Sequence, residues 1–523
     1  MSLRARWLGR VRFADAYAVQ RALFLRARDP YLLLLEHPHV FTLGLRGSME
    51  NVLVDPASVG AELVRTNRGG DVTYHGPGQL VGYPILSWPD QPDATPTYVR
   101  SVEQVVIDAC ADLGLPADGL GRLDGYPGVW VDPRGPNPRK LCAVGVRRTR
   151  GRTMHGFALN VDPDLAWFDR IVPCGIPDKT VTSLAAEGLD ASMRQVVDAV
   201  VARAAEQWEA GRSERADVAW RDPALGRIAE AGLGEGLSIG ERKPPWLRVR
   251  ADMGPGYREI KHTMRSLQLV TVCEEAGCPN IFECWNDGTA TFMINGDRCT
   301  RSCGFCLVDT RRPGPPDPTE PEHVAEAVAR MGLAHAVVTA VARDDLADGG
   351  AAQFAATVDA IRARCPGTAV EVLVPDCKGE PAALAALFAA RPDVLNHNLE
   401  TVPRLQRAVR PQASYARSLA VLGDAKSAGL VTKSGLIVGM GETIDEVFSA
   451  MADLRNVGVD ILTVGQYLRP SAAHLPVARW WRPEEFARIR QAGQAMGFTH
   501  VEASPLTRSS YHARQASEAA TQR

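Results

Sequence analysis

The feature that most constrains the fold is a regular alternation of short apolar segments with amphipathic stretches, which begins at residue 291. The apolar segments are rich in β-branched residues, as in AVVTAV at 336–341. The stretches between them have apolar residues three and four positions apart, as in AAQFAATVDAIRAR at 351–364. Repeated βα units imply a parallel sheet, either open or closed into a barrel. Six units between 291 and 496, followed by a strand at 499–504, predict a partial (β/α)6 barrel with functional groups at the carboxyl ends of its strands.

The first two hundred residues have a different pattern, in which short apolar runs are broken by Gly and Pro. Helical periodicity appears only at 97–113 and 192–209, so this part is predicted to be a separate α/β domain. The predicted strands of its mixed sheet are 31–37, 78–88, 128–132, 140–148 and 154–162. Residues 209–241 are rich in Gly and charge with weak periodicity, which is typical of a linker. The predicted organisation is a first domain over 1–208, a linker over 209–241 and a second domain over 242–523.

Composition excludes several classes of protein. A chain of 523 residues is too long for one hydrophobic core, in agreement with two domains. Its 59 basic and 61 acidic residues nearly cancel, so no overall field favours nucleic acid or an anionic membrane. The chain has no apolar run of signal-peptide or membrane-spanning length, and we expect a cytoplasmic protein. Six of the eleven cysteines lie between residues 273 and 306, a crowding that indicates metal rather than a disulfide framework.

Three of these cysteines lie in CTRSCGFC, directly after the predicted strand at 291–295. We call Cys299, Cys303 and Cys306 the downstream trio. A structural zinc site is one interpretation, but zinc needs a fourth ligand nearby. The alternative is a four-iron cluster with one iron open to S-adenosylmethionine, which a reduced cluster can cleave to a 5'-deoxyadenosyl radical. The C-x3-C-x2-C spacing after a first barrel strand resembles that of radical SAM enzymes.

Three further cysteines, Cys273, Cys278 and Cys284, form the upstream trio in TVCEEAGCPNIFECW. This C-x4-C-x5-C pattern resembles that of lipoyl synthase, and so do RSSYHA at 508–513, NHNLETVPRL, TKSGLIVGMGE and GQYLRPS. The resemblance runs from about residue 242 to the end. It implies two [4Fe-4S] clusters, the auxiliary one bound by the upstream trio and Ser510. This auxiliary cluster would supply two sulfur atoms to C6 and C8 of an octanoyl chain. Without the resemblance, RSSYHA reads as a polar turn.

Polar groups end several of the predicted barrel strands. GMGE at 439–442, NHN at 396–398 and RDD at 343–345 lie where they could hold the nucleoside and methionine parts of the cofactor. Each group alone is equally compatible with a turn or a salt bridge.

Three features of the first domain point to acyl chemistry. Cys174 lies in VPCGIPDKTVTSL, a loop that can present a side chain, although an idle buried thiol is the simpler interpretation of a lone cysteine. RGGDVTYHGPGQL at 68–80 is either the lining of a narrow acyl pocket or a glycine-rich hairpin. Lys140 lies at the mouth of a strand, where it could exchange protons with a nucleophile. Cys110, in an apolar helical pattern, is predicted to belong to the core.

Together with HGFALNVD, these motifs resemble lipoyl (octanoyl) transferase within the biotin and lipoate protein ligase fold, over residues 1 to about 208. The resemblance implies that Cys174 forms an octanoyl thioester and that Lys140 is its acid and base. Thr180 departs from the family pattern, which usually has Gly there. The implied substrate-binding residues are Arg68, Gly69, Gly70, Asp71, Val72, Thr73, Tyr74, His75, Ala143, Val144, Gly145, Gly156, Phe157 and Ala158.

The two resemblances together imply a bifunctional enzyme of lipoate biosynthesis. Its implied partners are octanoyl-acyl-carrier protein, the lipoyl carrier domains of 2-oxoacid dehydrogenase E2 subunits and the glycine cleavage H protein, and a low-potential flavodoxin or ferredoxin. Three alternatives remain. They are an ATP-using lipoate ligase in the first half, a non-enzymatic metal or redox module, and another sulfur-inserting radical SAM enzyme such as biotin synthase.

Overall fold

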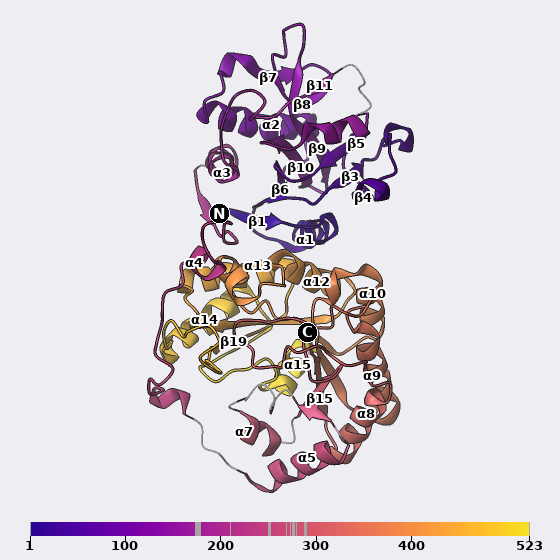
Figure 1. Ribbon diagram of the computed structural model, residues 1–523, viewed down its shortest axis with the longest axis vertical. Coiled ribbons are helices and arrows are strands. Elements are labelled where there is room, and N and C mark those ends of the chain that lie inside the picture. Colours follow the sequence, from indigo (N-terminus) through magenta and orange to yellow (C-terminus); the bar gives the residue numbers. More distant parts are fainter. Residues whose placement is uncertain are drawn as a thin grey trace. The chain divides into compact units, whose positions relative to one another are not determined.

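The structure is a computed structural model that describes most of the chain (Figure 1). The described residues are 2–172, 179–209, 211–248, 253–267, 269–271, 274, 278, 280–286 and 290–521. They form two compact units, Met1–Trp220 and Arg221–Arg523. The two-domain α/β prediction is confirmed.

The first unit is built on a mixed sheet whose strand order is β12-β1-β2-β6-β10-β9-β8-β7, with β11 paired to β9. Its central strands are almost wholly buried, because helices or loops cover both faces. All five predicted strands are present. The bounds are β1 Leu3–Arg10, β2 Tyr31–Glu36, β6 Gln79–Ile85, β7 Leu120–Leu123, β8 Tyr126–Val131, β9 Arg139–Thr149, β10 Arg152–Asn160, β11 Thr180–Val181 and β12 Ser213–Arg215.

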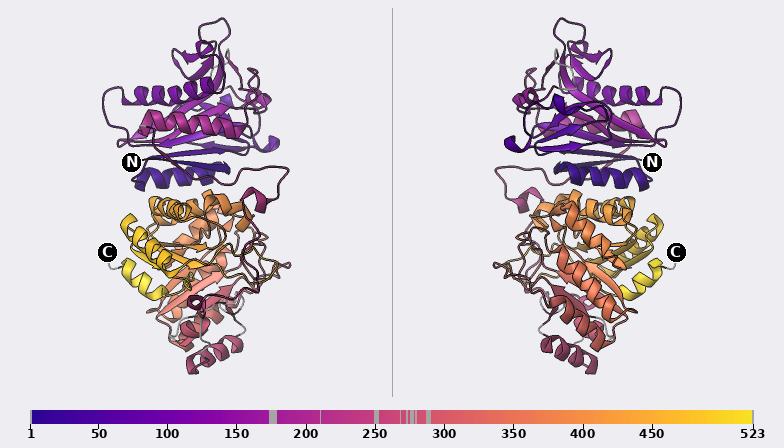
Figure 2. Two further views of the ribbon diagram at one scale, coloured as in Figure 1. Left: turned by 90° about the vertical axis from the view of Figure 1, so that its left-hand side faces the viewer. Right: turned by 90° about the vertical axis from the view of Figure 1, so that its right-hand side faces the viewer.

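Three helices and a small second sheet complete this unit. The predicted helices are α2 (Ala94–Asp112) and α3 (Met193–Glu209), which run side by side (Figure 2). The structure adds α1 (Phe13–Arg26), which packs on β6 and β10. The small sheet has the order β4-β3-β5, with β3 at Val40–Leu43, β4 at Glu62–Arg65 and β5 at Val72–His75. Residues 68–80 are therefore not a hairpin. The Gly76–Gly78 turn leads from β5 in the small sheet to β6 in the large one.

The second unit contains the predicted parallel sheet. Its strands follow sequence order from β13 to β20, and all neighbours from β14 onward are parallel. The two edge strands do not pair with each other among the described residues, so the barrel is partial, as predicted. The bounds are β13 Val270–Thr271, β14 Thr291–Ile294, β15 His335–Ala340, β16 Ala369–Leu373, β17 Val394–Asn396, β18 Val431–Val438, β19 Ile461–Gln466 and β20 His500–Ala503.

Helices cover the outer face of this sheet (Figure 1). The helix α15 packs Ala516 against Val394 and Ile461, which are the first residues of β17 and β19. The helices of this unit are α4 Arg227–Glu230, α5 Pro255–Ser266, α7 Ile281–Asn286, α8 Glu320–Met331, α9 Ala351–Arg364, α10 Pro381–Ala389, α11 Gln406–Val409, α12 Tyr415–Ser427, α13 Ile444–Val457, α14 Pro483–Met496 and α15 Ala513–Thr521.

The segment predicted as a linker, 209–241, is more structured than its composition indicates. Its first part belongs to the first unit, because β12 pairs with β1 and Trp220 stacks on Trp7 with ring centroids 4.4 Å apart. Its second part packs on the second unit, where the Leu237 amide donates to the Val477 carbonyl oxygen. Weak periodicity misses both attachments, since they rest on backbone pairing and single side chains.

Candidate functional sites in the two units

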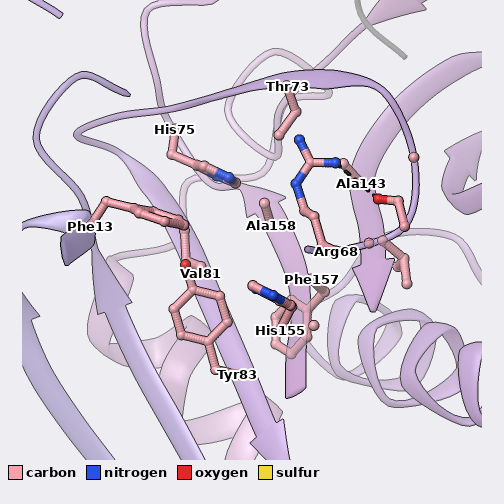
Figure 3. Close-up of a pocket in the computed structure, with 15 residues that line it drawn as sticks. Phe13, Arg68, Thr73, His75, Val81, Tyr83, Ala143, His155, Phe157 and Ala158 are labelled. Carbon is pink, nitrogen blue, oxygen red and sulfur yellow. Dashed lines mark hydrogen bonds between the residues drawn. The ribbon is translucent and has the colours of Figure 1, made fainter. Parts of the chain in front are cut away.

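A pocket of about 500 Å³, counted to its open mouth, lies in the first unit between β5, β6, β9, β10 and the start of α1 (Figure 3). It is lined by all the predicted substrate-binding residues except Asp71, Val72 and Tyr74. Alternation along β5 explains two exceptions. Thr73 and His75 face the pocket, whereas Val72 and Tyr74 belong to the core beside the small sheet. Asp71 instead accepts hydrogen bonds from the Ser48 amide and the Asn51 side chain.

Four further lining residues are missing from the prediction: Phe13, Val81, Tyr83 and His155. Val81 and Tyr83 lie two positions apart on β6, so alternation within GQLVGYPI places both on one face. Nothing local in the sequence brings Phe13 to this pocket, because the packing of α1 on the sheet places it there. The wall is therefore largely apolar, with glycines where β9 and β10 approach the space.

The polar side chains of the pocket are Arg68, two neutral histidines, Thr73 and Tyr83 (Figure 3). Burial lowers the pKa of His75 to about 3, and the charges of His37 and Arg68 act in the same direction. Burial also lowers the pKa of His155 to about 3. His75 Nδ1 lies 2.8 Å from Gln79 Oε1, and this amide oxygen accepts a proton, so we assign the proton of His75 to Nδ1. The other ring nitrogen, Nε2, is then an acceptor.

Arg68 is buried beside these rings, and its guanidinium donates to the Thr42 carbonyl oxygen at 2.5 Å and to the Thr42 hydroxyl at 2.9 Å. These bonds hold the arginine charge against β3 at one side of the pocket. The pocket thus combines an apolar wall with one fixed cation, an arrangement suited to a chain with a polar head group.

Lys140 faces the same side of the sheet as the pocket because of an irregularity in β9. Val129 pairs with Cys142 and Trp130 pairs with Lys140, so Leu141 is an extra residue in β9. A bulge of this kind reverses the alternation, which puts Lys140 and Cys142 on opposite faces. Lys140 Nζ lies 4.7 Å from the centre of the Trp130 ring. Ala143 follows Cys142 on β9, so it faces the side of the sheet opposite to Cys142, and it lines the pocket.

The two described cysteines of the first unit cannot act as nucleophiles. Cys110 and Cys142 are both fully buried. Burial raises the pKa of Cys110 to about 12 and raises that of Cys142 well above its usual range. Cys174, the remaining thiol of this unit, lies outside the described residues. Val181, a few residues after it, pairs with Lys140.

In the second unit the downstream trio lies on the loop that follows β14, at the carboxyl edge of the sheet. Cys299 Sγ accepts hydrogen bonds from two backbone amides, that of Arg301 at 3.4 Å and that of Ala342 at 3.3 Å. Cys299 and Cys306 pack beside a small apolar cluster that includes Met293. Amide donors pointing at sulfur stabilise a thiolate, so this loop is prepared for sulfur-bound metal.

Contacts within the second unit hold this loop in place. Arg301, inside the loop, is buried and pairs with Asp344 at 2.7 Å and with the fully buried Asp376 at 2.6 Å. The Gly304 amide donates to the Val409 carbonyl oxygen, and His474 Nε2 lies 2.8 Å from the Cys306 carbonyl oxygen. Sequence reasoning missed the role of Arg301, because its partners come from distant strand ends.

The donor set is three free cysteines on one loop, Cys299, Cys303 and Cys306. Three thiolates can hold three corners of a four-iron cluster, whereas a structural zinc ion takes four protein ligands. Burial raises the pKa of Cys303 to about 12 and that of Cys306 to about 11, so binding of iron must displace their protons.

The structure also brings the C-terminal RSSY segment beside part of the upstream trio. Asn280 donates to the Leu506 carbonyl oxygen at 2.7 Å, and the Tyr511 hydroxyl donates to Glu283 at 3.1 Å. Burial raises the pKa of Cys278, while the nearby charge of Arg508 opposes this rise. Ser510 is half-buried in this segment. Of the other two cysteines of the trio, Cys273 lies outside the described residues and the side chain of Cys284 is not described.

The predicted cofactor groups at the strand ends have different roles. Arg343 and Asp345 pair with each other, so the RDD group braces the sheet edge through salt bridges. Asn398 Oδ1 is buried and has no hydrogen-bond partner among the described atoms, which leaves an acceptor for an amino group. Glu442, at the end of GMGE, accepts from the Met440 amide at 3.0 Å and from the Gly439 amide. Burial raises the pKa of Glu442 to about 7.

An ion pair inside the barrel has no counterpart in the sequence prediction. Lys433 on β18 and Glu371 on β16 are both fully buried, with Lys433 Nζ 2.9 Å from Glu371 Oε1. Asn396 also donates to Glu371, at 3.1 Å. Lys433 and Glu371 lie on two strands separated by β17, so the sequence pattern of either strand does not show that their side chains meet.

Comparison with known proteins covers both units. Residues 12–205 match the lipoyl protein ligase A/B catalytic domain, residues 293–454 match the radical SAM superfamily, and residues 234–278 match the N-terminal domain of lipoyl synthase of the radical SAM family. No described helix is long and apolar enough to cross a membrane.

Similar proteins include the lipoyl synthase of Rubrobacter xylanophilus, which is 61% identical over 278 residues, 53% of this chain and 87% of that protein. The lipoyl synthase of Mycobacterium avium is 59% identical over 52% of this chain and 89% of that protein. A solved bi-partite lipoate protein ligase from Thermoplasma acidophilum is 18% identical, covers 41% of this chain and 87% of that chain, and has a TM-score of 0.35, too low to support an argument. The chain therefore belongs, through its second unit, to the lipoyl synthase family of radical SAM enzymes, and its first unit carries a lipoyl protein ligase A/B catalytic domain.

Proposed function

We propose that this chain carries out two consecutive steps of lipoate biosynthesis. The predicted first domain, residues 1–208 within the first unit, transfers an octanoyl group to a lysine of a lipoyl carrier domain. The predicted second domain, residues 242–523 within the second unit, inserts two sulfur atoms into that octanoyl group. The observation that carries the proposal is the presence, in one chain, of an apolar pocket on the sheet face that Lys140 shares and a three-cysteine loop at the edge of a radical SAM barrel.

For the transfer step we assign Cys174 as the nucleophile and Lys140 as its acid and base. Support comes from the burial of the other two thiols of the unit and from the bulge that turns Lys140 toward the pocket face. Lys140 removes the thiol proton, Cys174 attacks the carbonyl carbon of the donor thioester, and the departing donor thiolate receives that proton. The carrier lysine then attacks the new thioester as Lys140 takes a proton from its amine and returns it to Cys174.

The pocket supplies the binding site for the octanoyl chain. Its apolar wall suits an alkyl chain. The acceptor nitrogen of His75 lies 3.4 Å from the Thr42 hydroxyl in this structure. A thioester exchange conserves the energy of the acyl bond, so the transfer needs no ATP. The proposed donor is octanoyl-acyl-carrier protein. The proposed acceptors are the lipoyl domains of 2-oxoacid dehydrogenases and the H protein of glycine cleavage.

For the sulfur insertion step we assign one [4Fe-4S] cluster to the downstream trio and a second to the upstream trio with Ser510. When bound, the first cluster and S-adenosylmethionine supply a carbon radical able to abstract hydrogen from an alkyl chain. The chain's own residues bind and orient these groups. Asn398 Oδ1 offers an acceptor to the cofactor's amino group, and the 439–442 loop borders its place at the sheet edge. A flavodoxin or ferredoxin is the proposed electron donor.

Two measurements test the proposal. Anaerobic purification followed by iron and sulfide analysis should give about eight iron atoms per chain, the content of two four-iron clusters. Zinc in place of iron would contradict the assignment. Separately, the unmodified chain should transfer octanoyl groups in the absence of ATP, and Cys174→Ala should abolish this transfer. Sulfur insertion into a pre-octanoylated carrier should continue in the variant. An acyl adduct trapped at Cys142 or a requirement for ATP would overturn the transfer mechanism.

A further inference from the structure

Residues 206–233 are matched by neither family model, yet the end of this stretch is built into the second unit. Ala231 is fully buried there. The carboxylate of Glu230, almost wholly buried, pairs with Arg407 at 2.6 Å. The Leu237 amide donates to the Val477 carbonyl oxygen at 2.7 Å. We call residues 230–237 the junction strap.

One arginine joins the junction strap to the loop at 439–442. The Arg404 guanidinium donates to the Ala231 carbonyl oxygen in the strap and to the Gly441 carbonyl oxygen in the loop, the latter at 2.9 Å. It also forms a two-point salt bridge with Glu446, at 2.7 and 2.9 Å. Glu446 completes the capping box with Thr443 at the start of α13, directly after the loop. Arg404 therefore holds three segments at fixed distances from one another.

A second connection reaches the other end of the same loop. The Leu237 amide bonds to Val477, and the next residue, Ala478, donates its amide to the Gly439 carbonyl oxygen at 2.8 Å. The strap approaches this segment so closely that a Cβ on Gly236 would lie 2.6 Å from the Val477 carbonyl oxygen. Gly236 also has a φ of +64°, which favours glycine. The strap is thus linked to both ends of the loop, to Gly441 through Arg404 and to Gly439 through Val477 and Ala478.

We propose that the junction strap is a working part of the cofactor site, and that Arg404 is a positioning residue that transmits its docking to the 439–442 loop. This inference rests on the proposed function in one respect, namely that the loop borders bound S-adenosylmethionine. The strap also lies close to Gly441 itself, where a Cβ would meet the Leu233 side chain at 2.6 Å. If the strap undocks, Arg404 loses its hydrogen bond to the Ala231 carbonyl oxygen, and Gly441 loses the neighbouring Leu233 side chain.

Linkage gives the proposal a reciprocal consequence. If docking of the strap favours the loop conformation that binds S-adenosylmethionine, then S-adenosylmethionine must favour docking of the strap by the same factor. The segment between the two units would then respond to the state of the second site. Hydrogen exchange at strap amides reports this directly and does not depend on turnover.

The test uses the full chain with reconstituted clusters, without reductant, and S-adenosylmethionine as the probe. Gly236→Ala should dislodge the strap, because the new Cβ meets the backbone of Val477 at a strained φ. Gly240→Ala is the matched control, since the nearest atom to its Cβ would be 3.9 Å away. Glu230→Gln loosens the strap by a separate route.

We expect Gly236→Ala and Glu230→Gln to raise the dissociation constant of S-adenosylmethionine roughly tenfold, the change that loss of one hydrogen bond to a charged group produces. Gly240→Ala should leave it unchanged. In the unmodified chain, S-adenosylmethionine should slow hydrogen exchange at the Leu237 amide. The inference would be overturned if both strap variants bind S-adenosylmethionine with unchanged affinity. It would also be overturned if S-adenosylmethionine does not change the exchange rate of the Leu237 amide. A chain that binds no S-adenosylmethionine at all would instead refute the proposed function.

Discussion

Removal of the Arg301 guanidinium should destabilise the second unit strongly, and more at neutral than at acidic pH. In Arg301→Met the fully buried carboxylate of Asp376 loses its ion-pair partner at 2.6 Å and keeps the more distant Arg417 at 3.9 Å, while Asp344 keeps access to solvent. Breaking a buried ion pair on one side costs about 3–5 kcal/mol, because a charge remains in a poorly solvated place. An exposed pair on the same loop offers the contrast. Arg311, whose side chain is 74% exposed, pairs with Asp309, and its loss should cost less than about 1 kcal/mol.

The pH dependence follows from Asp376. Burial raises its pKa, but the hydrogen bond and charge of Arg301 outweigh this and hold the pKa at about 2. A lowered pKa in the folded state contributes stability that is fully present above the ordinary pKa of an aspartate and is lost as pH falls through about 2. In Arg301→Met burial acts with much less opposition, so the pKa of Asp376 rises. The loss in free energy of unfolding caused by Arg301→Met is then largest at neutral pH, and it becomes smaller as Asp376 takes up a proton.

Hydrogen exchange followed by mass spectrometry measures this deficit in the second unit alone, through peptides of β15 and β16 in the cluster-free chain. The comparison is between Arg301→Met and Arg311→Met at pH 7.5 and pH 5. The reasoning is refuted if the two variants lose the same stability, or if the deficit of Arg301→Met does not decrease at the lower pH.

Three further outcomes follow from the site assignments. Lys140→Ala should slow both formation and breakdown of the acyl-enzyme by about a hundredfold or more, and single-turnover kinetics with each half-reaction measure this. Changing any cysteine of the downstream trio to Ala should stop reductive cleavage of S-adenosylmethionine, and continued release of 5'-deoxyadenosine would contradict it. Ser510→Cys should retain a second cluster and still release 5'-deoxyadenosine, but with little lipoyl product, because thiolate leaves iron less readily than a serine oxygen does. Ser509→Ala, which removes only the 2.6 Å hydrogen bond from Asn398, should be milder, and an unchanged lipoyl yield in Ser510→Cys would count against the serine ligand.

Much of the pocket follows from the sequence, and its exceptions show where sequence reasoning stops. RGGDVTYH at 68–75, AVG at 143–145 and GFA at 156–158 contain the eleven predicted lining residues, because glycine-rich motifs and short strands are local signals. Val72 and Tyr74 belong to the same motif, yet side-chain alternation along β5 turns them toward a second core. No motif near Phe13 in the sequence indicates a pocket residue, because only the packing of α1 on the sheet brings it to the pocket.

The sequence by itself determined the class of each unit, because βα alternation and cysteine spacing are properties of neighbouring residues. Tertiary structure decided which side chains meet. An extra residue in β9 turns Lys140 to the pocket face, and strand ends far apart in the chain bring Asp344 and Asp376 to Arg301. The junction strap is the clearest case. Its glycines and charges resemble those of a free linker, and only the closeness of Val477 to Gly236 and of Arg404 to Ala231 shows that it is docked. Such contacts depend on distances across the folded chain, which local composition does not encode.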